Sequence, residues 1–197
     1  QLRGAVQKGM MLNMLKLLLI VCVLGASARS SAVDRRNAIS SAVDRRKCII
    51  RSGNYGVTVK CPTGYVAIQL CTSGQSADCN GAYTKLRCCA VTGPTNPGGL
   101  ETFEAKFGVR LACSGKKAVT SVCSSGRRSD CGNGVFNRIN CTDGLGLNLS
   151  QRCKWVSAWH GRWARCSADE VISGVCSSGS TADCKGFYTN IYCCLVE

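Results

Sequence analysis

The sequence predicts an all-β, disulfide-rich fold, because three observations agree. The chain has 197 residues and 17 cysteines, a density that is typical of secreted scaffolds held together by disulfides. The cysteines recur with a period of 52 to 53 residues, which indicates one structural unit present in three copies. Each copy contains short apolar runs with the length of strands, and units this small bury a core only against one another. We therefore expect a closed arrangement with three sides.

Three strands are expected in each repeat, because three runs of strand length are bounded by Gly, Asn, Ser or Asp. In the first repeat these runs are Tyr55 to Cys61, Tyr65 to Cys71 and Ala82 to Cys88. Counting back from Cys88, Cys141 and Cys193, which are equivalent in the three repeats, gives two sets of equivalent positions. One set is the apolar Leu86, Ile139 and Ile191, and the other is the aromatic Tyr83, Phe136 and Tyr188. The aromatic set is either core or a platform on which sugars stack.

The N-terminal part of the chain has the pattern of a secretory leader. Residues 1–28 contain a short apolar run from Met14 to Val23, followed by Ala26-Ser27-Ala28. A basic start, an apolar centre and small residues predict a signal peptide cleaved after Ala28. The run is shorter than the ~20 apolar residues of a membrane span.

Residues 29–46 are interpreted as a pro-segment. Ser30-Ser-Ala-Val-Asp-Arg-Arg36 recurs as Ser40-Ser-Ala-Val-Asp-Arg-Arg46, and each copy ends in a dibasic pair. Exposed Arg-Arg pairs are typical processing sites, so we expect cleavage after Arg36 and Arg46, although a solvated charged linker remains the alternative. The mature chain is then 47–197, one domain with repeats at about 48–91, 100–142 and 153–197.

Processing changes the charge and the cysteine count. The whole chain has 25 Lys and Arg, 11 Asp and Glu and a formal net charge of +14. Residues 1–46 hold eight of these basic residues, two of the acidic residues and Cys22, so the mature chain carries +8 and 16 cysteines. An even number of cysteines favours complete pairing.

The repeat positions suggest a disulfide pattern. Cys48 and Cys89 have counterparts in Cys153 and Cys194, whereas the second repeat lacks both members together, with Leu100 and Thr142 in their places. This joint absence favours pairing within each repeat. Four cysteines are common to all three repeats, and in the first they are Cys61, Cys71, Cys79 and Cys88. Among these four we expect the first to pair with the fourth and the second with the third, although spacing alone does not fix connectivity. The expected pairs are Cys48–Cys89, Cys61–Cys88, Cys71–Cys79, Cys113–Cys141, Cys123–Cys131, Cys153–Cys194, Cys166–Cys193 and Cys176–Cys184.

The repeat resembles the vitelline membrane outer layer protein I family. The resemblance rests on the period of about 53 residues, on an aromatic-Gly run before the first cysteine, and on an acidic turn before the last cysteine. The runs are Tyr55-Gly56-Val57, Phe107-Gly108-Val109 and His160-Gly161-Arg162-Trp163, and the acidic turns end in Asp78, Asp130 and Asp183. The resemblance implies a β-prism of three sheets, secretion, a structural role in egg or mucosal coats, and a shape similar to that of β-prism lectins.

The aspartates Asp78, Asp130 and Asp183 are the candidate carbohydrate-binding residues. Each lies in a polar loop between the second and third cysteines, and threefold repetition would bring all three to one end of the domain. Carboxylates accept hydrogen bonds from sugar hydroxyls. Alternatively, each aspartate only caps its own turn. Trp155, Trp159 and Trp163 pack in the core or form a stacking strip.

Several function classes lack support in the sequence. No Cys-x-x-Cys or histidine pair is present, so we expect no metal site and no cofactor. No catalytic residues are assigned, because His160 has no identifiable nucleophile and Asp169 and Glu170 are adjacent, so the chain is not expected to be an enzyme. The basic residues are scattered and match no nucleic-acid fold, and no membrane span remains after signal removal.

We therefore expect a secreted, extracellular structural coat protein that binds carbohydrate. The +8 charge favours partners such as glycans or anionic matrix and mucin components, although it also serves plain solubility. Asn148, in the motif Asn-Leu-Ser, is a glycosylation candidate. The alternative function is that of a cationic secreted defence or venom component, and a glycan-cleaving enzyme ranks below both.

Overall fold

The computed structural model of the chain describes residues 42–73, 77–93, 98–124, 130–132, 134–143, 145–178 and 182–197. The expected cleavage sites after Ala28 and Arg36 lie outside these residues. Within the described residues the fold is all-β, with twelve strands, no helix and three four-stranded sheets. The predicted fold class is confirmed at this level.

The strands fall into three consecutive segments of four strands each. The first segment holds β1 (Val43–Gly53), β2 (Val59–Lys60), β3 (Tyr65–Thr72) and β4 (Thr84–Val91). The second holds β5 (Leu100–Ala105), β6 (Leu111–Ala112), β7 (Ala118–Ser124) and β8 (Asn137–Thr142). The third holds β9 (Leu149–Ala158), β10 (Ala164–Arg165), β11 (Glu170–Ser177) and β12 (Thr189–Val196).

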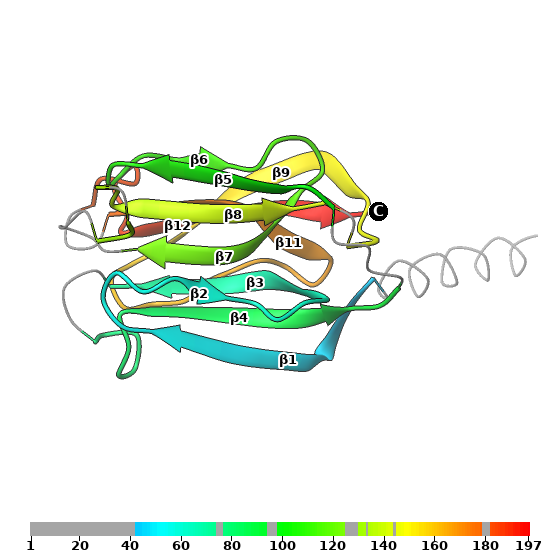
Figure 1. Ribbon diagram of the computed structural model, residues 1–197, viewed down its shortest axis with the longest axis horizontal. Helices are drawn as coiled ribbons and strands as arrows, with labels where there is room; N and C mark the ends of the chain where they lie inside the picture. Colours follow the sequence, from blue (N-terminus) through cyan, green and yellow to red (C-terminus); the bar gives the residue numbers. More distant parts are fainter. Residues whose placement is uncertain are drawn as a thin grey trace, which may run out of the picture. The chain divides into compact units, whose positions relative to one another are not determined.

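Each sheet combines three strands of one segment with one short strand of another. The strand orders are β1-β4-β3-β10, β2-β7-β8-β5 and β6-β11-β12-β9, with all neighbours antiparallel. Strand β2 therefore joins the sheet of the second segment, β6 joins that of the third, and β10 joins that of the first. Figure 1 shows β2 between β7 and β4. This exchange of short strands links the three segments in a cycle.

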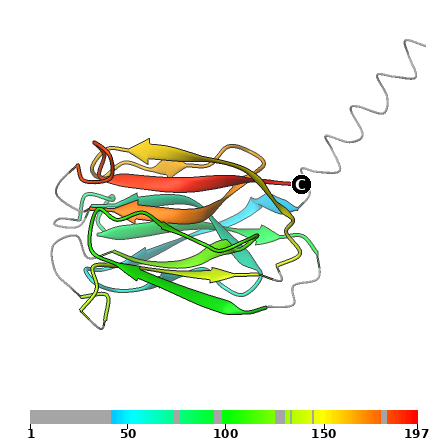
Figure 2. The same cartoon turned by 90° about the horizontal axis from the view of Figure 1, so that it is seen from above.

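The core lies where the three sheets face one another. The strands β3, β7 and β11 contact each other pairwise, and Figure 2 shows the same sheets from above. Leu86, Ile139 and Ile191, which occupy equivalent positions in the sequence, are at most 1% exposed in this core. Burial of these apolar side chains by all three segments at once explains why one segment alone would have no interior.

A buried layer of hydroxyl groups joins the segments at one end of this core. Thr72, Ser124 and Ser177 directly follow Cys71, Cys123 and Cys176, and all three are at most 1% exposed. The Ser124 and Ser177 Oγ atoms are 2.5 Å apart, and Ser177 Oγ donates to Thr72 Oγ1 at 3.0 Å. Mutual hydrogen bonding satisfies polar groups that would otherwise be costly to bury.

Eight disulfides connect strands and loops within the segments, and none crosses from one segment to another. They are the eight pairs expected from the cysteine spacing: Cys48–Cys89, Cys61–Cys88, Cys71–Cys79, Cys113–Cys141, Cys123–Cys131, Cys153–Cys194, Cys166–Cys193 and Cys176–Cys184. Bridges in this number are typical of proteins that fold in an oxidising environment.

The strand assignment differs from the sequence expectation in two places. The first expected strand, Tyr55 to Cys61, is mostly a turn, because Gly56 adopts φ +65°, and only Val59–Lys60 is a strand. The long outer strands β1, β5 and β9 were not expected. They carry many exposed side chains and lack the regular apolar alternation that identifies strands in a sequence.

The fold also begins before the expected mature start at Lys47. Strand β1 starts at Val43, and Val43 and Asp44 pair with Val91 and Ala90 of β4. The dibasic pair Arg45 and Arg46 therefore lies inside the folded segment.

Candidate functional site

Three loops closed by short disulfides lie at one end of the described domain (Figure 1). The bridges Cys71–Cys79, Cys123–Cys131 and Cys176–Cys184 each span a sequence separation of 8 residues. The loops connect β3 to β4, β7 to β8 and β11 to β12. We call them the stapled loops; residues 74–76, 125–129 and 179–181 of these loops lie outside the described residues.

Each candidate aspartate contacts a glycine from another segment. Asp78 lies against Gly161, Asp130 against Gly56, and Asp183 against Gly108. The glycines have φ values of +64°, +65° and +73°, and a β-carbon added to any of them would come within 2.6 to 2.9 Å of its aspartate. Both the backbone conformation and the close approach therefore favour glycine at these positions.

The three aspartates thus lie at three separate junctions between segments. All three are exposed and lie at the same end of the domain, as expected, but each faces a different turn. A single site built from all three carboxylates does not follow from this arrangement.

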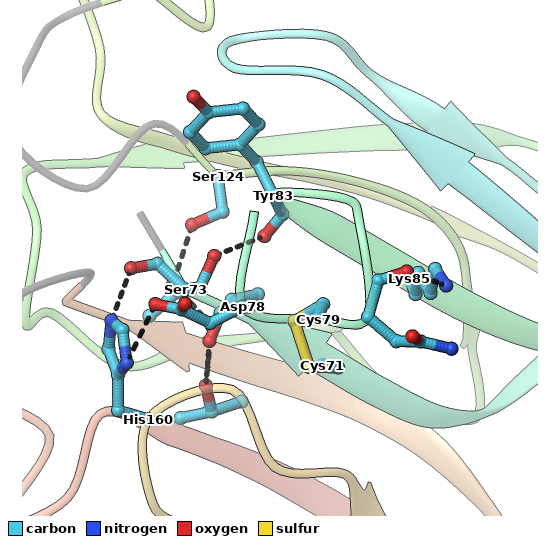
Figure 3. Close-up of a disulfide and its surroundings, with 12 residues drawn as sticks. Cys71, Ser73, Asp78, Cys79, Tyr83, Lys85, Ser124 and His160 are labelled. Atoms are coloured by element: carbon cyan, nitrogen blue, oxygen red, sulfur yellow. Dashed lines mark hydrogen bonds and ion pairs between the residues drawn. A yellow bond between two sulfur atoms is a disulfide. The ribbon is translucent and has the colours of Figure 1, made fainter. Parts of the chain in front are cut away.

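The junction at Asp78 differs from the other two because it contains the single histidine of the chain. His160 Nδ1 lies 3.2 Å from Asp78 Oδ2, and His160 Nε2 lies 2.8 Å from the carbonyl oxygen of Ser73 (Figure 3). Both partners are oxygen atoms that accept hydrogen bonds. The side chain thereby joins the turn after β9 to the first stapled loop.

The same cluster contains Ser, His and Asp but lacks the geometry of a hydrolytic triad. His160 Nε2 faces the carbonyl oxygen of Ser73 and not its hydroxyl. Ser73 is fully buried, and its Oγ donates to the carbonyl oxygen of Tyr83 at 3.4 Å. A triad instead requires the nucleophile hydroxyl to bond to the imidazole.

A cleft of about 590 Å³ opens beside this cluster. One wall is the first stapled loop, and the other is the turn after β9 together with β10. Strand β10 holds this wall in place, because Ala164 and Arg165 pair with Leu70 and Gln69 of β3. The lining residues are Asp78, Cys79, Asn80, Gly161, Arg162, Trp163 and Arg165.

The side chains of this cleft combine an indole with polar and positive groups. Trp163 is half-buried, whereas Asn80, Arg162 and Arg165 are exposed. Neither arginine has an acidic partner among the residues that the structure describes. Both guanidinium groups are therefore available to a ligand.

The equivalent turns in the other segments lack this chemistry. Their sequences after the glycine are Val57-Thr58-Val59-Lys60 and Val109-Arg110-Leu111-Ala112, against Arg162-Trp163-Ala164-Arg165 here. Arg110, at the position of Trp163, lies over the Trp155 ring with its guanidinium carbon 4.4 Å from the ring centre. The backbone contacts are thus repeated three times, but the indole and the two unpaired arginines occur once.

The equivalent aromatic residues form edge-to-face pairs at the same end of the domain and do not lie in the core. Tyr83, Phe136 and Tyr188 are half-buried, and each ring packs against the residue before the glycine of its own segment. The ring centres of Tyr83 and Tyr55 are 5.5 Å apart, those of Phe136 and Phe107 are 5.3 Å apart, and those of Tyr188 and His160 are 5.2 Å apart.

The three tryptophans have separate environments. Trp155 stacks on Tyr192 with ring centres 4.9 Å apart, Trp159 is 60% exposed, and Trp163 lines the cleft. None of them belongs to the fully buried core, so the expected core packing is not found. Because their surroundings differ, they do not form the expected stacking strip either.

Asn148 is exposed in the connection between β8 and β9, directly before β9 begins. Its Oδ1 accepts a hydrogen bond from Lys116 Nζ at 2.6 Å. An exposed asparagine is sterically compatible with the glycosylation expected from its motif.

Sequence reasoning singled out Asp78 and Trp163 separately but did not bring them together, and it assigned no role to Arg162 or Arg165. It also missed Asn80, which adopts φ +54° directly after the stapling Cys79. The available signal was the departure of the third turn from the other two, where Arg162 and Trp163 stand in place of Val57 and Thr58 in the first turn and of Val109 and Arg110 in the second.

The chain matched none of the protein families, curated proteins or solved structures with which it was compared. Among the described residues, no helix is long and apolar enough to cross a membrane.

Proposed function

We propose that the protein is a secreted, extracellular structural protein of the vitelline membrane outer layer type, with a β-prism fold and one carbohydrate-binding cleft. The cyclic exchange of β2, β6 and β10 supports a prism, because each sheet is completed by another segment. Eight disulfides support an extracellular location.

The cleft beside Asp78 carries the proposal of carbohydrate binding. Sugar rings present apolar faces that stack on aromatic side chains, and their hydroxyls exchange hydrogen bonds with carboxylate and amide groups. Trp163 supplies the aromatic surface, and Asp78 and Asn80 supply polar groups on the facing wall. The stapling disulfide and β10 hold both walls before any ligand arrives, which lowers the entropic cost of binding.

A glycan array with the secreted, processed protein tests this function. We expect binding to defined saccharides that persists at high salt. The variants Trp163→Thr, which copies Thr58 of the first turn, and Asp78→Asn should lose this binding. The matched variants Asp130→Asn and Asp183→Asn should retain it, because their junctions lack the tryptophan. Salt-resistant binding that survives Trp163→Thr and Asp78→Asn would contradict the assignment of the cleft.

A cationic defence or venom function is the second candidate. It is favoured by the excess of basic over acidic residues, which draws a protein to anionic bacterial envelopes. Killing of bacteria at physiological salt, unaffected by Trp163→Thr, would favour this function over carbohydrate binding. Retention on an egg coat or mucin without killing would favour the structural role.

A further inference from the structure

We propose that the cleft selects an anionic saccharide, with a sulfate or carboxylate group held between Arg162 and Arg165 and a sugar ring stacked on Trp163. This inference rests on the proposed carbohydrate-binding function and names the class of ligand that the cleft takes.

The charges of the cleft support an anionic ligand. Arg162 and Arg165 both line it, both are exposed, and neither is neutralised by an acidic side chain in the described part of the chain. The one carboxylate of the lining, Asp78, contacts His160. Guanidinium groups bind sulfate and carboxylate through two parallel hydrogen bonds, so the pair suits an oxyanion better than a neutral hydroxyl.

Alternation along β10 places Trp163 and Arg165 on one face, and Arg162 reaches the cleft from the turn that precedes β10. Ala164 is 1% exposed and belongs to the core. Neighbouring residues of an extended chain point to opposite faces, so Trp163 and Arg165 both point away from the core and into the cleft. An anionic substituent can therefore contact Arg165 while its sugar ring lies on Trp163.

The wall that carries these residues is fixed by contacts with the first segment. The Cys166 N–H donates to the carbonyl oxygen of Ile68 at 3.1 Å, directly after the two β10 pairs. At the other end of the turn, Gly161 lies against Asp78. The backbone of residues 162–165 is thus held between two fixed points, which restricts the positions from which the two arginine side chains extend.

The other two junctions serve as internal comparisons. The first turn has Val57, Thr58 and Lys60 where the cleft has Arg162, Trp163 and Arg165, and the second has Val109, Arg110 and Ala112. Neither combines two unpaired arginines with a tryptophan. We therefore expect one anionic saccharide per chain and not three, despite the threefold sequence.

Calorimetric titration of the secreted protein tests the inference with three probes of equal length. These are a heparin oligosaccharide with sulfates and carboxylates, a hyaluronan oligosaccharide with carboxylates only, and an uncharged chito-oligosaccharide. We expect a stoichiometry of one for a charged probe and affinity at least about tenfold above that for the neutral probe. The comparison of heparin with hyaluronan identifies which anion is preferred.

Variants that copy the other turns locate the binding. Arg162→Val and Arg165→Ala, which reproduce Val109 and Ala112, should each weaken binding of the charged probe about tenfold. Trp163→Thr should weaken binding of all probes. Arg152→Ala removes the same charge from an exposed position on β9 and should change the affinity less than about twofold.

The outcomes separate the two proposals. Equal affinity for neutral and charged probes, lost in Trp163→Thr, would retain carbohydrate binding and overturn the anionic preference. Weakening by Arg152→Ala equal to that by Arg162→Val would also overturn it, because binding would then follow total charge. Absence of binding to every probe would reject the carbohydrate function itself.

Discussion

Gly161 and Asp78 are in such close contact that a β-carbon on the glycine would lie 2.9 Å from both the β-carbon and the carbonyl oxygen of the aspartate. This contact joins the third segment to the first, and equivalent contacts join Gly56 to Asp130 and Gly108 to Asp183. The backbone and β-carbon of the aspartate in each stapled loop therefore pack against the turn of another segment. Among the residues that the structure describes, the contact at Asp78 borders the cleft lined by Arg162, Trp163 and Arg165.

The Gly161→Ala variant should reduce stability through both strain and collision. A side chain at φ +64° costs about 1–2 kcal/mol, and displacement of Asp78 should add about 1–3 kcal/mol. Gly81→Ala is the matched control, because Gly81 has φ +82° but nothing within 4 Å of an added β-carbon. Denaturant unfolding should give a larger loss for Gly161→Ala. Equal losses would show that the contact with Asp78 contributes nothing.

The His160→Phe variant should lower the free energy of unfolding by about 1 kcal/mol. Phe107 occupies the equivalent position in the second segment, so a phenyl ring can still pack on Tyr188. Both polar contacts of His160 are lost, and the effect is modest because its side chain and that of Asp78 are 33% and 44% exposed. A double-mutant cycle with Asp78→Asn measures their coupling. A coupling energy of zero would contradict a stabilising contact.

Features that depend on the repeat spacing could be predicted from the sequence, whereas strands that form through pairing with a distant strand could not. The eight disulfides and the buried Leu86, Ile139 and Ile191 follow from repeat spacing, because equivalent residues adopt equivalent positions. The outer strands do not follow from it. In β1, apolar and charged residues do not alternate, and pairing with β4 decides its structure.

The cleft could not be predicted because its walls are distant in sequence. Asp78 and Trp163 meet only because β10 adds to the sheet of the first segment beside β3. Neither periodicity nor composition specifies which segment receives a short strand. The sequence nevertheless carried the chemical signal, since Arg162 and Trp163 depart from the residues at the same positions in the other two turns.

Stability should fall in acid partly through Glu170. Burial would raise the pKa of this carboxyl, but hydrogen bonds from Lys154 and Ser167, together with the Lys154 charge, outweigh burial and hold the pKa below its usual value. The unfolded chain then takes up the proton more readily than the folded one. The contribution is therefore present above the ordinary glutamate pKa and lost as the pH falls through the lowered value.

We expect the free energy of unfolding of the natural protein to decline more steeply than that of Glu170→Gln between about pH 5 and pH 3. Lys154→Ala should flatten the decline as well, since it removes a hydrogen bond and a charge that favour the carboxylate. Parallel curves for the natural protein and Glu170→Gln would refute this assignment.

The dibasic site Arg45-Arg46 should resist proteolysis while the protein is folded. Arg45 Nη2 donates to the carbonyl oxygens of Ser167 and Glu170, the latter at 3.1 Å, and burial lowers the pKa of its guanidinium. Two residues beyond this pair, Cys48 is bridged to Cys89. Arg45 and Arg46 lie in an irregular part of the edge strand β1, between the β4 pairs of Asp44 and Cys48. The contacts of Arg45 and the Cys48–Cys89 bridge therefore supply the expected protection, because they keep this stretch from extending into a protease cleft.

Trypsin digestion of the full chain, followed by mass spectrometry of the new N-termini, checks this resistance. We expect cleavage after Arg46 only when the disulfides have been reduced. Arg45→Ala, which removes the contacts with Ser167 and Glu170, should admit cleavage after Arg46 in the oxidised protein as well. Rapid cleavage of the oxidised natural protein after Arg46 would contradict the expected protection.

A ninth disulfide should form when Leu100 and Thr142 are both replaced by cysteine (Leu100→Cys and Thr142→Cys). Leu100 lies directly opposite Thr142 on β5 and β8, as Cys48 lies opposite Cys89 and Cys153 opposite Cys194. Leu100 is 63% exposed, so its replacement removes little buried surface. We expect the double variant to gain about 2–4 kcal/mol in unfolding free energy, because the bridge restricts the unfolded chain. The gain should vanish when both positions carry serine. Free thiols in the purified double variant would mean that the second segment departs from the backbone geometry of the other two.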